Sequence, residues 1–400
     1  MSNYSYTTDF FSFIKEHLND DIHTLLLKKN KNFPFDYTFA VEQIEIRKKI
    51  KLKLPNWYKN FRLIFPSKLS YEQASSEITA QYKQRLLHGN SVCDLTGGLG
   101  IDSFYLSQVA QRAIYVEINQ DYCEAAIHNF SELEASSVQI VHDNCEHYID
   151  STNCFSDTYY IDPARRGNEN RRLYALSDCE PDILKLKNKI LTKGKRLIIK
   201  ASPMLDIHAS LLALGDVTQV HILSVRNECK ELLFVIDKTS SDKNTQLVCV
   251  NFSTSGKEQI YTAGFKEEKE NIPVISGEVH RFLYEPNASI LKAGLFKSIS
   301  AQYRIGKLHI NSHLYTSDEM IGYFPGRIFE ITESFDFSKK NMVSVACKYP
   351  QANVSVRNFP LSADTLRGKM RIKEGGDIYL FATTLFPDNK KLIIGKKITD

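Results

Sequence analysis

The chain has 400 residues, of which 42% are hydrophobic and 24% are charged. This composition is that of an ordinary folded protein and excludes wholesale disorder, and the length predicts two or three domains at roughly 100–200 residues each. No apolar run approaches the ~18 residues that a membrane span needs, and the first residues lack the basic-then-apolar order of a signal peptide. We therefore expect a soluble, cytoplasmic protein without a membrane partner.

The eight cysteines are too few and too scattered for a disulfide scaffold, and no two of them form a CxxC pair. The 11 histidines show no spacing typical of metal ligands. The sequence therefore predicts reduced cysteines and no metal site.

Charge is distributed unevenly along the chain. Residues 1–90 carry 14 basic and 9 acidic side chains, and residues 361–400 carry 8 and 5, so the two ends are positive and the middle is negative. This asymmetry hints at a polyanionic partner that the ends of the chain would bind.

The first ~90 residues predict helices, because apolar side chains such as Phe10, Phe13 and Ile14 recur at helical spacing. From residue 91, short apolar runs alternate with amphipathic stretches, a pattern that predicts a doubly wound, Rossmann-like α/β sheet with helices on both faces. The expected strands are Ser91–Leu95, Ala113–Glu117, Val138–His142, Thr158–Asp162 and Arg196–Lys200, and the expected helices are Asp102–Val109, Asp121–Glu132 and Pro181–Leu191.

The regular alternation ends after residue 216. Two strand-like runs, Val217–Val225 and Glu231–Ile236, are separated by a few polar residues and predict an antiparallel hairpin that closes the sheet. From about Gly277, strand-like sequence broken by turns such as Phe324-Pro325-Gly326 predicts a smaller α+β C-terminal domain.

The most informative segment is residues 92–102, VCDLTGGLGID in one-letter code. An apolar strand enters a glycine-rich turn there, and an amphipathic helix follows at once. Glycines let the backbone approach a ligand closely, and the helix N-terminus offers free N–H groups to a negative group. Thr96, Gly97, Gly98 and Gly100 are therefore candidate cofactor-binding residues.

Acidic residues follow the next two strands. Glu117 ends the second strand, where a carboxylate can accept hydrogen bonds from both hydroxyls of a ribose. Asp143 follows the third strand and is placed to reach an adenine amino group. With their neighbours Ile118 and Asn144, these residues belong to the edge of the sheet where open α/β folds bind ligands.

Asp94, just before the turn, distinguishes two nucleotide-like cofactors. A dinucleotide fingerprint has the spacing GxGxxG, which Gly97-Gly98-Leu99-Gly100 does not fit well. An acidic residue here suits S-adenosylmethionine, whose amino-acid end carries an ammonium that a nicotinamide dinucleotide lacks. Asp94 therefore favours S-adenosylmethionine, and the alternative is that it only caps the turn.

The fourth strand ends in residues 160–165, YIDPAR. Together with Asp94–Gly100, Glu117 and Asp143, this segment resembles the ordered motifs of class I S-adenosylmethionine-dependent methyltransferases. In the nucleic-acid members, a (D/N/S)-P-P-x tetrapeptide at this strand end contacts the cofactor's methyl group and the acceptor base. Leu69–Lys83 also resembles the segment that precedes the cofactor loop in RNA-modifying relatives.

Two later segments, Asn227–Leu233 and Asn358–Thr383, resemble a bacterial group of these methyltransferases that carries a THUMP-like C-terminal domain after a small ferredoxin-like domain. THUMP domains bind RNA, so the resemblance implies an RNA partner. It also implies four parts: a helical region at 1–88, the methyltransferase domain at 89–275, a ferredoxin-like segment at 276–322 and the THUMP-like domain at 323–400.

The tetrapeptide here is DPAR, which leaves the acceptor atom open. An aromatic fourth residue normally stacks on a base whose exocyclic amine is methylated, whereas Arg165 offers only a planar guanidinium. The resemblance implies that Asp162 and the Pro163 carbonyl orient the acceptor, with Arg165 and Lys200 beside it. Alternatively, Asp162-Pro163 only ends the strand and Lys200 is a solvated strand end.

Basic residues gather in three places: at 47–71 among aromatic residues, at 165–172, and at 367–373 with a strand-like alternation that would put all four side chains on one face. In the first cluster, the aromatic residues either stack on unpaired bases or pack inward, and both interpretations stay open.

The sequence as a whole predicts an S-adenosylmethionine-dependent methyltransferase that acts on a base in structured RNA, either tRNA or rRNA. Two alternatives remain. One is a methyltransferase of a small molecule or a protein, and the other is a non-catalytic RNA-binding protein with the same fold.

Overall fold

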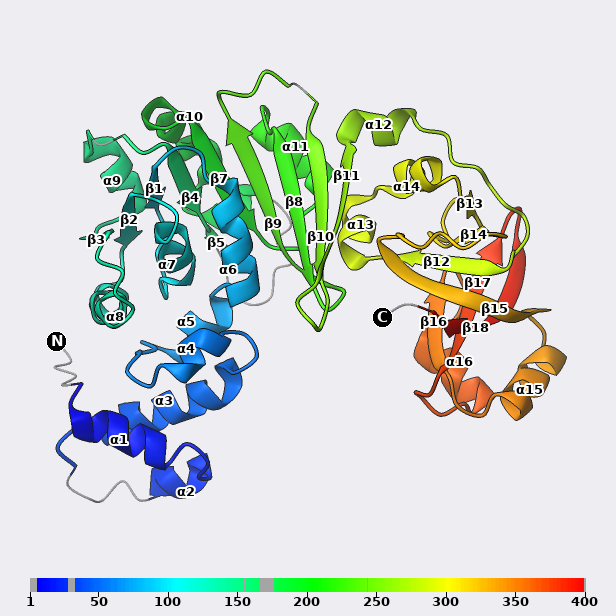
Figure 1. The fold of residues 1–400 in the computed structure, drawn as a ribbon, viewed down its shortest axis with the longest axis horizontal. Coiled ribbons are helices and arrows are strands. Elements are labelled where there is room, and N and C mark those ends of the chain that lie inside the picture. Colours follow the sequence, from blue (N-terminus) through cyan, green and yellow to red (C-terminus); the bar gives the residue numbers. More distant parts are fainter. Residues whose placement is uncertain (1–5, 28–32, 154, 166–175, 243, 399–400) are drawn as a thin grey trace. The chain divides into compact units, whose positions relative to one another are not determined.

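A computed structural model describes residues 6–27, 33–153, 155–165, 176–242 and 244–398 (Figure 1). The chain divides into two compact units, and each is described by itself. Unit 1 consists of Met1–Val217 and Leu233–Ser241, and unit 2 of Thr218–Leu232 and Asp242–Asp400. Within the described ranges, no helix is long and apolar enough to cross a bilayer.

Unit 1 begins with helices, which confirms the predicted helical N-terminal region. Asp36 starts the longest of them by accepting a hydrogen bond from the Phe39 amide at 2.9 Å. Phe10, Phe13 and Ile14 are buried together in the core that these helices share. The helices are α1 (Thr8–Glu16), α2 (Ile22–Leu27), α3 (Tyr37–Ile50), α4 (Pro55–Lys59), α5 (Lys68–Gln73) and α6 (Glu77–Lys83).

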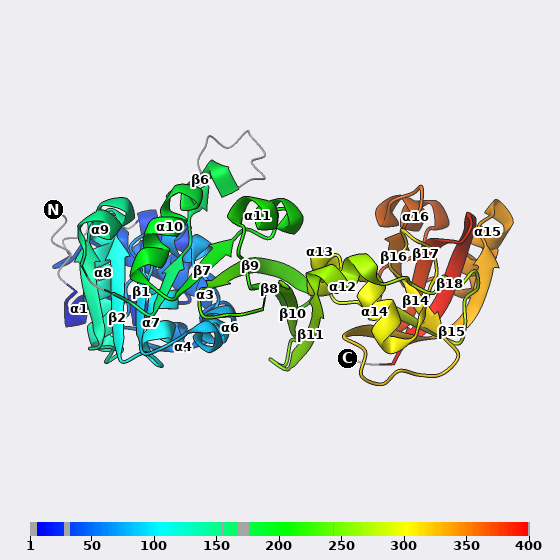
Figure 2. The same cartoon turned by 90° about the horizontal axis from the view of Figure 1, so that it is seen from above.

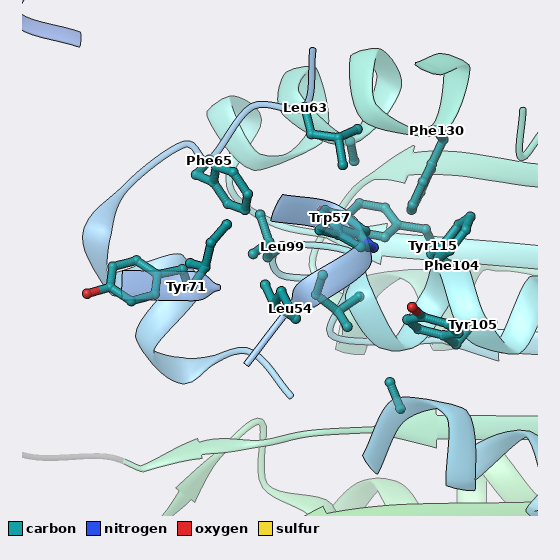
Figure 3. Packing of buried hydrophobic residues seen from close by; sticks show 14 of the residues in the cluster. Leu54, Trp57, Leu63, Phe65, Tyr71, Leu99, Phe104, Tyr105, Tyr115 and Phe130 are labelled. Atoms are coloured by element: carbon teal, nitrogen blue, oxygen red, sulfur yellow. The ribbon is translucent and has the colours of Figure 1, made fainter. Parts of the chain in front are cut away.

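The aromatic residues of the first basic cluster pack inward. Trp57 and Phe65 are buried in a core cluster that also contains Tyr115 of the sheet (Figure 3). The Arg47 guanidinium is buried too, and it donates to the carbonyl oxygens of Asn60, Phe61 and Leu63. These contacts favour a structural role for this segment over base stacking.

The sheet of unit 1 has the predicted parallel strands, in the order β7-β4-β1-β2-β3, and β9 lies beside β7. Figure 2 shows α9, α10 and α11 on one side of it and α7 with α4 on the other, so the sheet is covered on both faces. The strands are β1 (Ser91–Asp94), β2 (Arg112–Glu117), β3 (Val138–His142), β4 (Thr158–Ile161), β7 (Arg196–Ala201) and β9 (Glu228–Asp237). The helices between them are α7 (Ile101–Ser107), α8 (Gln120–Glu132), α9 (Cys145–Ser151), α10 (Ile183–Lys193) and α11 (Ile207–Leu214).

The predicted hairpin exists, but it does not close the sheet. β8 (Gln219–Val225) turns into β9 through Arg226 and Asn227, which have φ angles of 54° and 60°, as a two-residue hairpin turn requires. The prediction of closure was wrong, because the other edge of β8 pairs in parallel with β10 (Gln246–Phe252). β11 (Glu258–Gly264) then pairs antiparallel with β10.

Unit 2 contains a second sheet of seven strands in the order β13-β14-β12-β15-β18-β17-β16, which confirms the smaller α+β domain. Glu285 on β12 is buried and accepts hydrogen bonds from Arg327 and Arg357, so it links three segments of this unit. The strands are β12 (Phe282–Pro286), β13 (Gly306–Lys307), β14 (Tyr315–Ser317), β15 (Gly326–Asp336), β16 (Asn353–Arg357), β17 (Ile378–Leu385) and β18 (Asn389–Lys397). The helices are α12 (Phe265–Glu270), α13 (Ala288–Ala293), α14 (Phe296–Tyr303), α15 (Lys339–Lys348) and α16 (Ala363–Met370).

The predicted strand-like alternation at 367–373 is wrong, since residues up to Met370 belong to α16. Ser362 starts this helix by accepting from the Thr365 amide, and Leu366 and Met370, four residues apart, bury one face of it. A turn and a bridge follow instead of a continuous strand.

Candidate functional site

Unit 1 holds a cavity of about 500 Å³ where β1, β2, β3, β4 and β7 end. Its size is that of a small-molecule site. Among the described residues that line it, seven are acidic and Lys200 is the one lysine or arginine. The acidic residues are Asp94, Asp102, Glu117, Asp143, Glu146, Asp162 and Glu180.

Most of the residues that the sequence singled out meet at this cavity. Those that line it are Asp94, Thr96, Gly97, Gly98, Gly100, Glu117, Ile118, Asp143, Asn144, Asp162 and Lys200. Pro163 is buried and is not among the described lining residues. Arg165 pairs through its backbone with Cys179, where the short strands β5 (Ala164–Arg165) and β6 (Cys179–Glu180) meet, and Arg166, Arg171 and Arg172 lie outside the described residues.

The glycine loop after β1 packs directly against β2. The Gly97 amide donates to the Val116 carbonyl at 2.8 Å, and a Cβ atom at Gly97 would lie 2.2 Å from the Tyr115 ring. Gly100, with a φ of 85°, turns the chain into α7. Glu117 is fixed at the rim, because its two carboxylate oxygens accept from the amides of Gly98 and Asn119, both at 2.8 Å.

Asp94 lies at the bottom of the loop and is buried. Its carboxylate accepts from the Thr96 amide at 3.0 Å and from the Ser103 hydroxyl at 2.5 Å. Burial raises the pKa of Asp94 to about 7, despite these hydrogen bonds, and the negative charges of Asp102 and Asp162 add to the effect.

Asp162 and Lys200 form an ion pair at the cavity wall. The Asp162 side chain is 34% exposed, whereas that of Lys200 is 10% exposed, so the carboxylate is the more accessible partner. The Asp162 amide donates to the Thr96 hydroxyl at 2.7 Å. Thr96 therefore links the loop after β1 to the loop after β4.

The residues after β2 and β3 complete the rim. Ile118 is 64% exposed and offers an apolar surface. Asp143 contacts His147 Nδ1 at 2.8 Å, and the Asn144 side chain accepts from the Glu146 amide at 2.8 Å, where it caps α9. The Asn144 side chain thus has a structural role at the cavity.

Sequence analysis missed several lining residues, among them Ser75 and Asp102. They are hydrogen-bonded to each other at 2.7 Å although they are 27 residues apart. No spacing in the sequence connects them, and the single available signal was the resemblance of Leu69–Lys83 to the segment before the cofactor loop in related enzymes.

Comparisons with known proteins identify the family. Residues 282–325 match a ferredoxin-like domain family, and residues 326–397 match a family described as THUMP domain-like. The whole chain is similar to the crystal structure of a methyltransferase from Porphyromonas gingivalis, with a TM-score of 0.90, 34% identity and 98% of each chain covered. The chain belongs to this methyltransferase family.

This methyltransferase also has more distant relatives in two strains of Mycobacterium tuberculosis, each named as an uncharacterized S-adenosylmethionine-dependent methyltransferase. They are 23% identical to it over 316 residues, which are 76% of this chain and 79% of theirs. The predicted family and cofactor are thereby confirmed, and the protein is an S-adenosylmethionine-dependent enzyme.

The cavity of the methyltransferase fits its cofactor. S-adenosylmethionine carries two positive groups, a sulfonium and an ammonium, and it supplies an activated methyl group. An excess of carboxylates over ammonium groups on the cavity wall suits such a cation, and Gly97 lets the loop pack closely against Tyr115 beside the cavity.

Proposed function

We propose that this enzyme methylates a base in structured RNA, either tRNA or rRNA. The observation that carries the proposal is the THUMP-like match at residues 326–397. These residues include 13 lysines and arginines against seven acidic residues, whereas the whole chain has a net charge of +4. Such a domain suits the phosphates of a nucleic acid.

Four basic residues lie near the end of α16, and three of them provide exposed charge for this contact. Arg367 is engaged in ion pairs with Asp364 and Glu374, at 2.7 and 2.5 Å. Lys369, Arg371 and Lys373 are exposed and make no ion pair with a described residue. We assign the RNA contact to these three side chains.

The residues of the cavity divide between cofactor and acceptor. Glu117 would hold the ribose, Asp143 and Ile118 the adenine, and Asp94 the ammonium of the cofactor. The acceptor would lie beside Asp162, Pro163 and Lys200. Because the methyl group is already activated, the main task of these side chains is to align the acceptor and to exclude water.

One observation favours a second candidate, a small molecule or a protein as the acceptor. The acidic lining of the cavity repels phosphate groups, which a neutral or cationic acceptor lacks. The two candidates differ in whether the enzyme binds RNA with the salt dependence of phosphate contacts.

A charge reversal tests the RNA proposal. We expect Lys369→Glu combined with Lys373→Glu to weaken binding of total tRNA or rRNA and to lower the slope of log K against log salt by about one unit for each phosphate that is no longer bound. A filter-binding salt titration measures both. Lys257→Glu with Lys266→Glu is the matched control, because both lysines are exposed outside the THUMP-like domain. If the wild-type enzyme shows no salt-sensitive RNA binding, the RNA proposal fails and the small-molecule or protein acceptor replaces it.

A pH titration tests the assignment of Asp94. Protonation below its pKa of about 7 removes the charge that would face the ammonium, so affinity for S-adenosylmethionine should fall as the pH falls. Between pH 8 and pH 6 we expect a loss of about tenfold, since about a tenth of the carboxyl groups stay ionised at pH 6. Calorimetric titration measures it. Asp94→Asn should bind weakly, and its profile reports the titration of the cofactor itself. If the affinity of the wild type and that of Asp94→Asn depend on pH in the same way, Asp94 does not bind the ammonium of the cofactor.

A further inference from the structure

A buried network lies beside the cofactor cavity and includes Lys83, which has no exposed side-chain surface. The Lys83 ammonium donates to Asp102 Oδ1 at 2.8 Å and to the Ser75 hydroxyl at 2.7 Å. Asp102 Oδ2 in turn accepts from the Ser75 hydroxyl at 2.7 Å and from the Tyr160 hydroxyl at 2.8 Å. The Lys83 ammonium also lies over the Tyr160 ring, 5.8 Å from its centre.

This network connects three segments that surround the cavity. Ser75 belongs to the connection between α5 and α6, outside the sheet. Asp102 is the second residue of α7, directly after the glycine loop, and Tyr160 lies on β4, two residues before Asp162. Ser75 and Asp102 line the cavity, together with Ser70 and Gln73 of α5 and with Ala74.

Stability alone does not account for a buried ion pair. Removing two charges from water costs several kcal/mol per ion, and replacing a buried pair with apolar side chains of similar volume is often neutral or stabilising. The pair is instead located where it can fix the wall of a binding site.

We propose that Lys83 and Asp102 are positioning residues of the methyltransferase, which hold the Ser70–Ser75 wall against the start of α7 and thereby maintain the cofactor cavity. The cofactor site then depends on the N-terminal region as well as on the sheet. The proposal rests on the cofactor of the family and not on the RNA substrate.

The ion pair of Lys83 and Asp102 also affects the electrostatic environment of Asp94. Burial would raise the pKa of Asp102, but Lys83 and Lys200 outweigh this and lower it below its ordinary value, so Asp102 stays charged. The other groups that face Asp102 are the neutral hydroxyls of Ser75 and Tyr160. The Asp102 charge contributes to the raised pKa of Asp94, and removing it should lower that pKa.

Two kinds of variant test the proposal with S-adenosylmethionine alone. In the combined variant Lys83→Met and Asp102→Asn, both charges are removed and the volumes are nearly kept. We expect it to fold, to bind S-adenosylmethionine at least tenfold more weakly, and to shift the pH midpoint of binding to lower pH. Calorimetric titration between pH 5.5 and 8.5, with thermal unfolding as the check on folding, measures these effects. If the folded variant binds S-adenosylmethionine as tightly as the wild type does, the positioning role is overturned.

Ser75→Ala keeps the charges of Lys83 and Asp102. It tests the proposal if the combined variant does not fold. It removes the hydroxyl that bridges Lys83 and Asp102, and we expect a loss of several-fold or more in cofactor affinity. Ser76→Ala is the matched control, because its hydroxyl contacts Thr79 and is not among the described lining residues. If Ser75→Ala and Ser76→Ala both bind S-adenosylmethionine as the wild type does, the positioning role is overturned. RNA binding does not enter either measurement, so a failed RNA proposal leaves this test intact.

Discussion

Gly97→Ala is expected to abolish measurable S-adenosylmethionine binding. A Cβ atom at this position would lie 2.2 Å from the ring of Tyr115, which is fully buried and packs edge-on against Phe130 with ring centres 5.7 Å apart. The ring has no room to move away, so the loop itself must shift. The Tyr115 hydroxyl also donates to the Gly98 carbonyl at 2.7 Å, so the displacement reaches the residue that binds Glu117.

The expected loss of stability is about 1–3 kcal/mol, which is typical of overpacking in a core. Differential scanning calorimetry checks the stability, and calorimetric titration checks the affinity for the cofactor. Gly98→Ala is the control on the neighbouring residue, since its Cβ atom would meet only the Thr96 carbonyl oxygen at 3.9 Å. Its φ of 53° favours glycine, so a smaller loss of about 1–2 kcal/mol is expected from backbone strain alone. Equal cofactor affinities of the two variants would contradict the argument from packing.

The predicted site residues that the structure brings to one cavity are those whose place the local pattern determines. β1 and β2 are short apolar runs, and Glu117 ends one of them. Because parallel strands carry their carboxyl ends to one edge of a sheet, residues at successive strand ends were expected to meet. Their meeting at one cavity follows from the topology, and no knowledge of side-chain packing was needed.

The missed features depend on contacts between distant segments. Lys83 and Asp102 are 19 residues apart, and nothing in their local sequence shows that the lysine is buried. Arg47 belongs to a basic stretch whose role the sequence left open, and its guanidinium is buried against backbone carbonyls. Near α16, the alternation of basic residues suggested a strand. The N-cap at Ser362 and the burial of Leu366 and Met370, four residues apart, instead stabilise a helix. In each case packing determines the outcome, and sequence spacing alone does not specify it.

The largest expected effect on turnover is at Asp162, whose carboxylate is the accessible member of the pair with Lys200. Asp162→Asn keeps the size of the side chain and the backbone donor to Thr96, and it removes the charge. If this carboxylate orients the acceptor, methyl transfer should fall about a hundredfold or more, which corresponds to about 2.7 kcal/mol in the barrier. Cofactor affinity should change little, because the loop geometry is preserved.

The measurement is transfer of a labelled methyl group to RNA isolated from cells that lack the gene, with calorimetric titration of the cofactor in parallel. Lys200→Met distinguishes two explanations of a loss at Asp162. If the ion pair acts as one unit, the two single variants and the double variant should lose similar activity, because residues that act together are not additive. If Lys200 only neutralises Asp162, Lys200→Met should retain most of the activity. Full activity in Asp162→Asn would place the acceptor elsewhere, since no other described carboxylate lies at the end of β4, between the glycine loop and β7.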